Sequence, residues 1–179
     1  MTTMTPEFTR ILDIRQLPVG PHDYSADETE RRRLAGRFGL SAIETFTATV
    51  TVAAENDVVS ATGRIHAAII QPCAISGEDF PVRIDEPLAL RFIPATGNAA
   101  SPDEEIEITS SDCDEIEYEG LTFDLGEALA QSLALAIDPF AEGPNADKAR
   151  AEHGLSGESQ GGAFAALAAL KPSTPERGN

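Results

Sequence analysis

The sequence lacks tryptophan and has few cysteines, lysines and tyrosines, two of each. Two cysteines, Cys73 and Cys113, can form at most one bridge, so the chain has no disulfide framework. Residues 1–10 lack the basic and apolar regions of a secretory signal. We therefore expect a cytoplasmic location, in which thiols stay reduced and both cysteines are unpaired.

Metal ligands are also scarce. A structural zinc site needs about four nitrogen, sulfur or oxygen ligands at suitable spacing. The three histidines, His22, His66 and His153, lie far apart in the sequence, and no Cys-x-x-Cys motif occurs. We expect no metal and no cofactor.

Long apolar runs and basic residues are the other absences. No stretch reaches the ~18 uninterrupted apolar residues of a membrane span, which argues against a membrane partner. Thirteen bases stand against thirty acids, a net charge of -17. A protein with this net charge repels the phosphate backbone of a nucleic acid, which argues against DNA binding. RNA could be bound only at a local patch of basic residues.

The sequence does contain enough apolar residues for one folded domain. Its 179 residues are 41% hydrophobic, which is typical of a soluble globular protein with a real core. We expect a single α+β domain over 1–140 and a flexible linker over 141–163, a glycine-rich stretch with few large apolar residues. Residues 164–179 then form a short docking helix and a tail, since Phe164, Leu167 and Leu170 recur at spacing three.

Alternation of apolar and polar residues predicts the strands. Between 43 and 54, phenylalanine, alanine and valine fall on one parity and four threonines on the other. The expected antiparallel strands cover 8–15, 42–55, 58–71, 82–92 and a pair within 105–123. They build a strongly twisted sheet or partly closed barrel, with a break or an edge at Pro87.

Two main helices are expected over 26–38 and 124–137. Ser25 and Glu28 have the spacing of a capping box for the first helix, and Gly39 ends it. Asp124 caps the second helix, in which apolar residues recur every four positions.

Four arginines in the first predicted helix form the only basic concentration: Arg31, Arg32, Arg33 and Arg37. Their guanidinium groups are suited to gripping phosphate. The alternative is a solvated helix whose arginines form salt bridges to Glu28 and Glu30. No aromatic residues interleave with them to stack bases, which weakens the RNA interpretation.

The segment Asp103–Glu119 contains nine acids and no base, interleaved with isoleucines and Tyr118. The pattern indicates short strands with an acidic outer face, which is either simply solvated or a patch for a basic protein. A Ca²⁺ or Mg²⁺ site is a third alternative, but the calcium-loop spacing is absent.

No motif of nucleophilic catalysis is present. The sequence contains neither Gly-x-Ser-x-Gly nor a P-loop. His66 and Cys73 are seven residues apart, so they would face opposite sides of one regular strand. We expect no enzyme.

Several segments together resemble the YceD family. The resemblance rests on Gln71–Pro81 with the strand 82–92, on the acidic segment, and on three later segments: 123–129, 135–140 and 164–170. The form is similar to proteobacterial members. Two features depart from the family. Many relatives have a cysteine where this chain has Ser76, and a cysteine cluster after the long helix that is missing here.

The resemblance implies a non-enzymatic role in ribosome biogenesis. These bacterial and plastid proteins are associated with accumulation of the large-subunit ribosomal RNA. The implied partner is that RNA or a basic ribosomal protein, and the net charge favours the protein. A small-ligand-binding, β-barrel-like module is the alternative. The expected partner-binding residues are Arg31, Arg32, Arg33, Arg37, Cys73, Phe80, Glu115 and Glu117.

Overall fold

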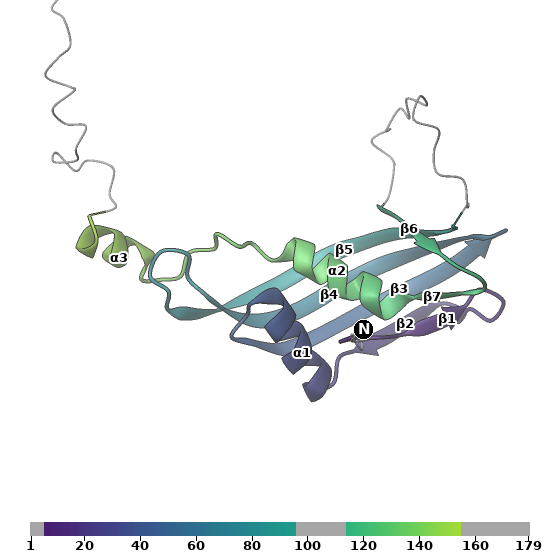
Figure 1. The fold of residues 1–179 in the computed structure, drawn as a ribbon, viewed down its shortest axis with the longest axis horizontal. Coiled ribbons are helices and arrows are strands. Elements are labelled where there is room, and N and C mark those ends of the chain that lie inside the picture. The colour runs from purple at the N-terminus through teal and green to yellow at the C-terminus, as the bar shows by residue number, and fades with distance from the viewer. Residues whose placement is uncertain (1–5, 96–113, 155–179) are drawn as a thin grey trace, which may run out of the picture.

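A computed structural model describes residues 6–95 and 114–154. In this part of the chain helices and strands are interspersed along the sequence (Figure 1). They are β1 Ile11–Asp13, β2 Pro21–Ser25, α1 Glu28–Phe38, β3 Ala42–Glu55, β4 Val58–Pro72, β5 Asp79–Pro94, β6 Asp114–Tyr118, β7 Thr122–Asp124, α2 Leu125–Ala136 and α3 Ala146–Glu152. No helix in these ranges is long and apolar enough to cross a membrane.

The main sheet has five strands in the order β2-β3-β4-β5-β6, and β1 pairs with β7 in a separate two-stranded sheet. The α+β class is therefore as predicted. Of the two predicted shapes, a twisted sheet or a partly closed barrel, closure into a barrel is not found, since the five-stranded sheet is open with β2 and β6 at its edges. The expectation of antiparallel pairing throughout was wrong, because β6 runs parallel to β5. A parallel neighbour requires a crossover of about a dozen residues or more, which 95–113 supply.

The hairpin of β3 and β4 matches its prediction closely. Side chains of one parity in β3, from Phe46 to Val52, are buried, whereas the threonines between them are exposed. Asn56 makes the turn with a positive φ of 55°. A register irregularity between Ile43 and Thr45 lets both Ile43 and Phe46 face the core although their parities differ.

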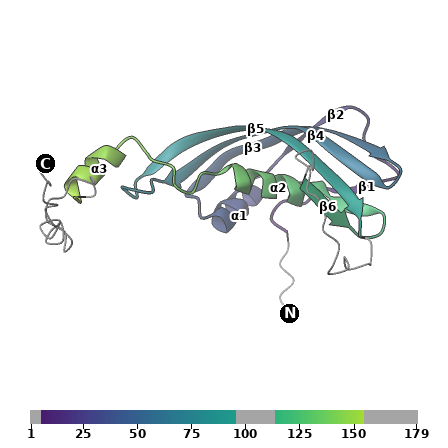
Figure 2. The ribbon, with the colours of Figure 1, turned by 90° about the horizontal axis from the view of Figure 1, so that it is seen from above.

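The sheet is curved, and α1 and α2 lie on its concave side (Figure 2). Gly63 of β4 pairs with Val50 of β3. A Cβ atom at Gly63 would stand 2.0 Å from the carbonyl oxygen of Thr49 on β3. Only glycine fits there, which is a common device where a sheet bends.

Helix α1 begins two residues later than predicted. Asp27 accepts a hydrogen bond from the Glu30 amide, and the Glu30 carboxylate accepts one from the Asp27 amide, each at 2.8 Å. The capping box is thus Asp27 and Glu30 rather than Ser25 and Glu28. Ser25 is the last residue of β2, a strand that the nearby prolines and glycine concealed. Gly39 ends α1 in the left-handed conformation, as predicted.

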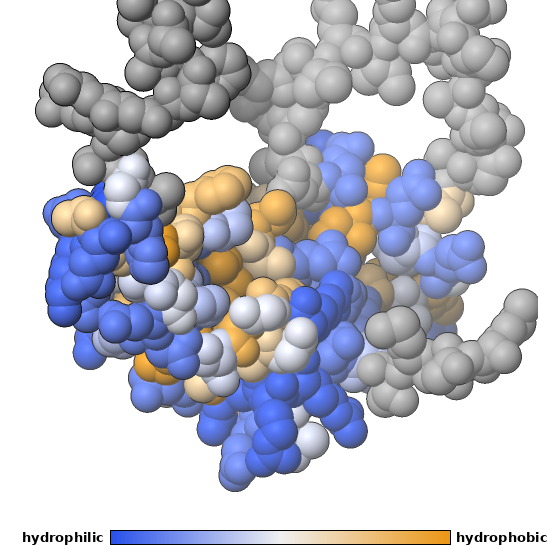
Figure 3. Space-filling model, turned by 60° about the vertical axis from the view of Figure 1, so that its left-hand side comes forward, coloured by the Kyte–Doolittle hydropathy of each residue, from blue (hydrophilic) through white to orange (hydrophobic). Residues whose placement is uncertain are grey.

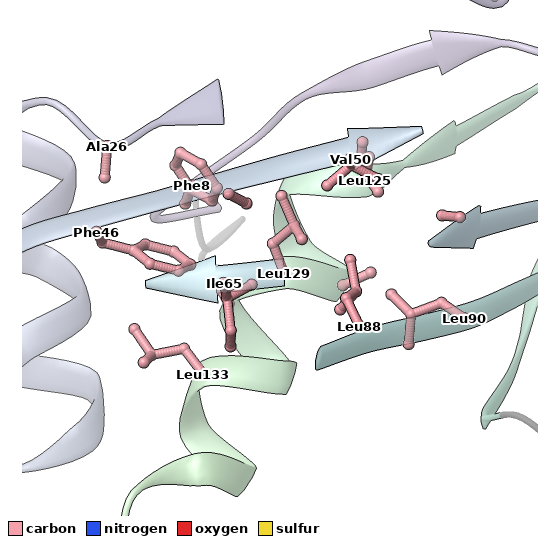
Figure 4. Close-up of a cluster of buried hydrophobic side chains, with 14 of the residues drawn as sticks. Phe8, Ala26, Phe46, Val50, Ile65, Leu88, Leu90, Leu125, Leu129 and Leu133 are labelled. Carbon is pink, nitrogen blue, oxygen red and sulfur yellow. The ribbon is translucent and has the colours of Figure 1, made fainter. Parts of the chain in front are cut away.

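Helix α2 closes the core against the sheet. Asp124 accepts a hydrogen bond from the amide of Glu127, as the capping prediction requires. Leu125, Leu129 and Leu133 are fully buried and point toward residues of β3, β4 and β5 (Figure 4). Gly126 allows the chain before β1 to pass, because a Cβ atom there would lie 2.6 Å from the Arg10 nitrogen.

Strand β5 continues through Pro87, and this proline lies at an edge of the sheet, which is one of the two predicted alternatives. β6 pairs only with residues 90–94, so β5 has no second neighbour beside Pro87 among the described strands. Proline lacks an N–H group and is tolerated where no neighbour needs it.

The predicted linker 141–163 contains the short helix α3, which the sequence did not indicate. Ala146 and Ala149 of this helix are buried, so small side chains suffice to dock it. The remainder of that linker, 155–163, and the predicted docking helix and tail, 164–179, lie outside the described residues.

Candidate partner-binding sites

Two arginines of α1 line a surface hollow. The Arg31 guanidinium donates to the carbonyl oxygen of Ala26 at 2.7 Å, and Arg32 pairs with Glu28 at 2.7 Å. Both line a cavity of about 350 Å³ between α1 and the start of β3, together with Ser41. The predicted salt bridge to Glu28 is therefore present.

Arg37 joins α1 to α2. Its guanidinium donates to both carboxylate oxygens of Glu127, at 3.0 and 2.8 Å, and to Glu7 at 3.1 Å. The pKa of Glu127 is lowered, mainly by the hydrogen bond from Arg37. The Arg37 guanidinium therefore links α1 to α2 through carboxylates of the same chain.

The other predicted acceptor, Glu30, is also occupied. The Glu30 carboxylate accepts hydrogen bonds from both terminal guanidinium nitrogens of Arg10, at 2.7 and 3.0 Å. This leaves Arg33, which is exposed and pairs with no residue in the described ranges. The four arginines share one helix, and of these Arg33 alone has neither an ion pair nor a side-chain hydrogen bond within residues 6–95 and 114–154.

The acidic strand β6 has the predicted two-sided character. Glu115 and Glu117 are exposed, whereas Ile116 is half-buried and Tyr118 is buried. The Tyr118 hydroxyl donates to the Asp57 carbonyl oxygen at 2.6 Å, which fixes the strand against the β3–β4 turn. Glu115 pairs with Arg91 at 2.8 Å. Residues 103–113 of the acidic segment lie outside the described residues.

Cys73 is buried in the turn that follows β4. Its sulfur accepts hydrogen bonds from the amides of Ile75 and Ser76, at 3.4 and 3.3 Å. Hydrogen bonds from the Ser76 side chain and amide, followed by that from Gly143, lower the pKa of the Cys73 thiol to about 7. Gly77 closes the turn in a left-handed conformation.

Phe80 lies beside this turn and contributes to a joint with the segment after α2. A Cβ atom at Gly143 would lie 3.0 Å from the Phe80 ring and 3.4 Å from the Cys73 Cβ atom. Gln71, a buried polar residue, donates to the Asp138 carbonyl oxygen at 3.1 Å. Cys73 and Phe80 are thus brought together, in a packed joint rather than on an open surface.

His66 lies on the exposed face of the sheet. Its Nδ1 atom is 3.5 Å from an oxygen of Asp85, which also pairs with Arg64 at 2.6 Å. Cys73 is buried in the turn after β4, whereas the His66 side chain is half exposed and faces Asp85. Within 6–95 and 114–154, no group of three or more His, Cys, Asp or Glu residues is arranged to hold a metal ion.

A further hollow was not predicted. A groove of about 520 Å³ lies between β5 and the last turns of α2, and its walls include Leu88, Leu90 and Leu135. In the sequence, the residue that could have indicated this groove is Leu135, because it falls outside the four-residue series Leu125, Leu129 and Leu133. In the structure Leu135 is 81% exposed.

Three comparisons were made, with models of protein families, with curated proteins and with solved structures, and none gives a match to this chain.

Proposed function

We propose that this chain is a non-enzymatic ribosome biogenesis factor, which acts in the cytoplasm and supports accumulation of large-subunit ribosomal RNA. The proposed direct partner is a basic ribosomal protein. The resemblance to the YceD family of segments 71–92, 123–129, 135–140 and 164–170, together with the acidic segment, supports the role. The charge distribution of the chain supports the choice of partner.

One observation carries that choice. Of the four arginines in α1, Arg31, Arg32 and Arg37 are engaged by oxygen atoms of the same chain. An RNA phosphate would have to displace these acceptors. It would also approach a chain of net charge -17. A basic protein is attracted at long range by the net charge, although it would have to displace Arg91 from Glu115.

The outward carboxylates of β6 form the proposed docking surface. Glu115 and Glu117 stand on one face of an edge strand whose opposite face is anchored by Tyr118. The pairing with β5 and the Tyr118 hydrogen bond hold these charges at a defined spacing in the folded chain.

A small-ligand-binding module is the second candidate, and the groove beside α2 is the observation that favours it. Its walls are largely apolar, as the pockets of ligand-binding proteins are. However, the groove is open to solvent and does not enclose a ligand. We therefore rank this function below the first.

The proposal is tested by affinity purification of the tagged chain from cells. Copurification of precursor particles of the large ribosomal subunit is the expected result, and their absence would reject the role. Binding is then measured by fluorescence anisotropy with two probes, purified basic proteins of the large subunit and fragments of its RNA.

Two double variants identify the docking surface. Glu115→Lys with Glu117→Lys is expected to weaken binding of the basic protein at least tenfold at low salt. The matched control reverses two other exposed strand acids, Glu44 and Glu55, and is expected to retain most of the affinity. RNA binding that is lost on charge reversal of Arg31, Arg32, Arg33 and Arg37 would identify RNA as the ligand instead.

A further inference from the structure

The groove between β5 and α2 is an apolar hollow in the described surface. Ile65, Leu88, Leu90 and Ala136 line it, Leu135 stands at its side, and the Glu86 carboxylate is exposed at its rim. Apolar residues also gather in the middle of the face shown in Figure 3 and are bordered by hydrophilic ones.

The groove lies beside a part of β5 that has a strand neighbour on one side alone among the described strands, and beside the outer face of α2. β6 covers β5 only from Leu90 onward, so the adjoining stretch 79–89 lacks a second neighbour among the described strands. Helix α2 turns Leu125, Leu129 and Leu133 into the core and leaves Leu135 on the outside. Ile65, Leu88 and Leu90 are at most 6% exposed at the floor of the groove, so the side chain that remains for another segment to cover is that of Leu135, which is 81% exposed.

The chain itself contains a segment of matching chemistry. Phe164, Leu167 and Leu170 recur at spacing three, separated by alanines, and Lys171 follows immediately. Its apolar side chains match the walls of the groove, and the lysine ammonium complements the carboxylate of Glu86. We propose that residues 164–171 bind in this groove of the same chain.

The covalent path is long enough for this contact. Residues 137–145 lead from the end of α2 to the start of α3. Residues 155–163 provide an equally long stretch for the return, and extended chain spans ~3.3–3.6 Å per residue. Because the tether keeps the segment at high effective concentration, modest apolar contacts are sufficient to hold it.

The absence of tryptophan permits a direct test. In the full chain carrying Phe164→Trp, the single indole is expected to emit at a shorter wavelength than in the unfolded chain. Adding Leu135→Glu to the groove is expected to shift the emission to longer wavelength. Val19, which is 95% exposed and does not line the groove, provides the control Val19→Glu. Circular dichroism verifies that each variant is folded.

A second reporter and a charge exchange make the test specific. Leu170→Trp repeats the measurement, so that a poor fit of one indole does not decide it. Glu86→Lys is expected to shift the emission toward that of exposed indole, and adding Lys171→Glu to restore it. Two reporters that both emit as exposed indoles, or that ignore Leu135→Glu, would overturn the proposal. A shift that disappears on dilution would also overturn it, by assigning the groove to a second copy.

Discussion

Arg37 and Glu127 are ninety positions apart in the sequence and form a bidentate pair, with nitrogen–oxygen distances of 3.0 and 2.8 Å. This pair fixes α1 beside α2 on the concave side of the sheet. Both side chains are about one-third exposed. Solvent therefore screens the attraction, and the bidentate geometry is what makes the pair useful.

Replacing this arginine is expected to cost more stability than replacing its exposed neighbour. We predict that Arg37→Ala lowers the free energy of unfolding by about 1 kcal/mol, because the pair is only partly shielded from solvent. Arg33→Ala is the control and is expected to stay within about 0.5 kcal/mol of the parent chain. Urea denaturation measures both, and equal losses in the two variants would contradict the structural role of Arg37.

The same pair predicts a dependence of stability on pH. The pKa of Glu127 is lowered from its ordinary value of 4.5, chiefly by the hydrogen bond from Arg37. A depressed carboxyl pKa contributes stability above the unfolded value, and the contribution is lost as the pH falls through the folded value. We predict that the chain loses stability below pH 4.5 more steeply than Glu127→Gln does. Parallel curves for the two proteins would refute this.

Two glycines of contrasting surroundings give a matched pair of substitutions. Gly63→Ala would place a methyl group 2.0 Å from the Thr49 oxygen, so we expect a loss of about 3 kcal/mol or failure to fold. A Cβ atom at Gly36, inside α1, has no neighbour within 4 Å. Gly36→Ala is therefore expected to stabilise the chain by about 0.5–1 kcal/mol. Thermal melting compares them, and similar midpoints would show that β4 can shift at Gly63.

The thiol of Cys73 offers a titration that reports on its turn. Ser76→Ala removes the side-chain hydrogen bond that contributes most to lowering the pKa of Cys73 from 9.0 to about 7. We predict that the pKa rises in this variant, which the ultraviolet absorbance of the thiolate measures in a Cys113→Ser background. Ser60→Ala, on the exposed face of β4, is the control. An unchanged titration in the Ser76 variant would mean that the backbone amides alone set the pKa.

The sequence pattern predicted correctly those elements that are determined by residues close together in the chain. The threonine alternation of β3 and the Asp124 cap of α2 depend on nearby residues, and both were found as expected. The start of α1 was misplaced because Ser25 and Asp27 both have a glutamate three residues later. The choice depends on β3, since the Ala26 amide donates to the Phe46 carbonyl oxygen and continues the strand to that point.

The candidate sites were harder to predict than the fold. The helix bearing the four arginines was found, but the acceptors that occupy Arg37 come from Glu7 and Glu127, far away in the sequence. The groove has the same origin, because its walls belong to β4, β5 and α2. Residue type indicates which groups are available, and only the tertiary fold determines which of them remain uncommitted.

The parallel attachment of β6 has a consequence for the order of assembly. β3, β4 and β5 pair with one another through 13 and 14 residue pairs, whereas the edge strands β2 and β6 are each held by five pairs to partners more than twenty positions away. Closing a long loop for few contacts makes such a strand late to form and early to open. The acidic surface thus lies on one of the two least extensively paired strands of the sheet, and a cationic protein bound to it would also stabilise the pairing of β6 with β5.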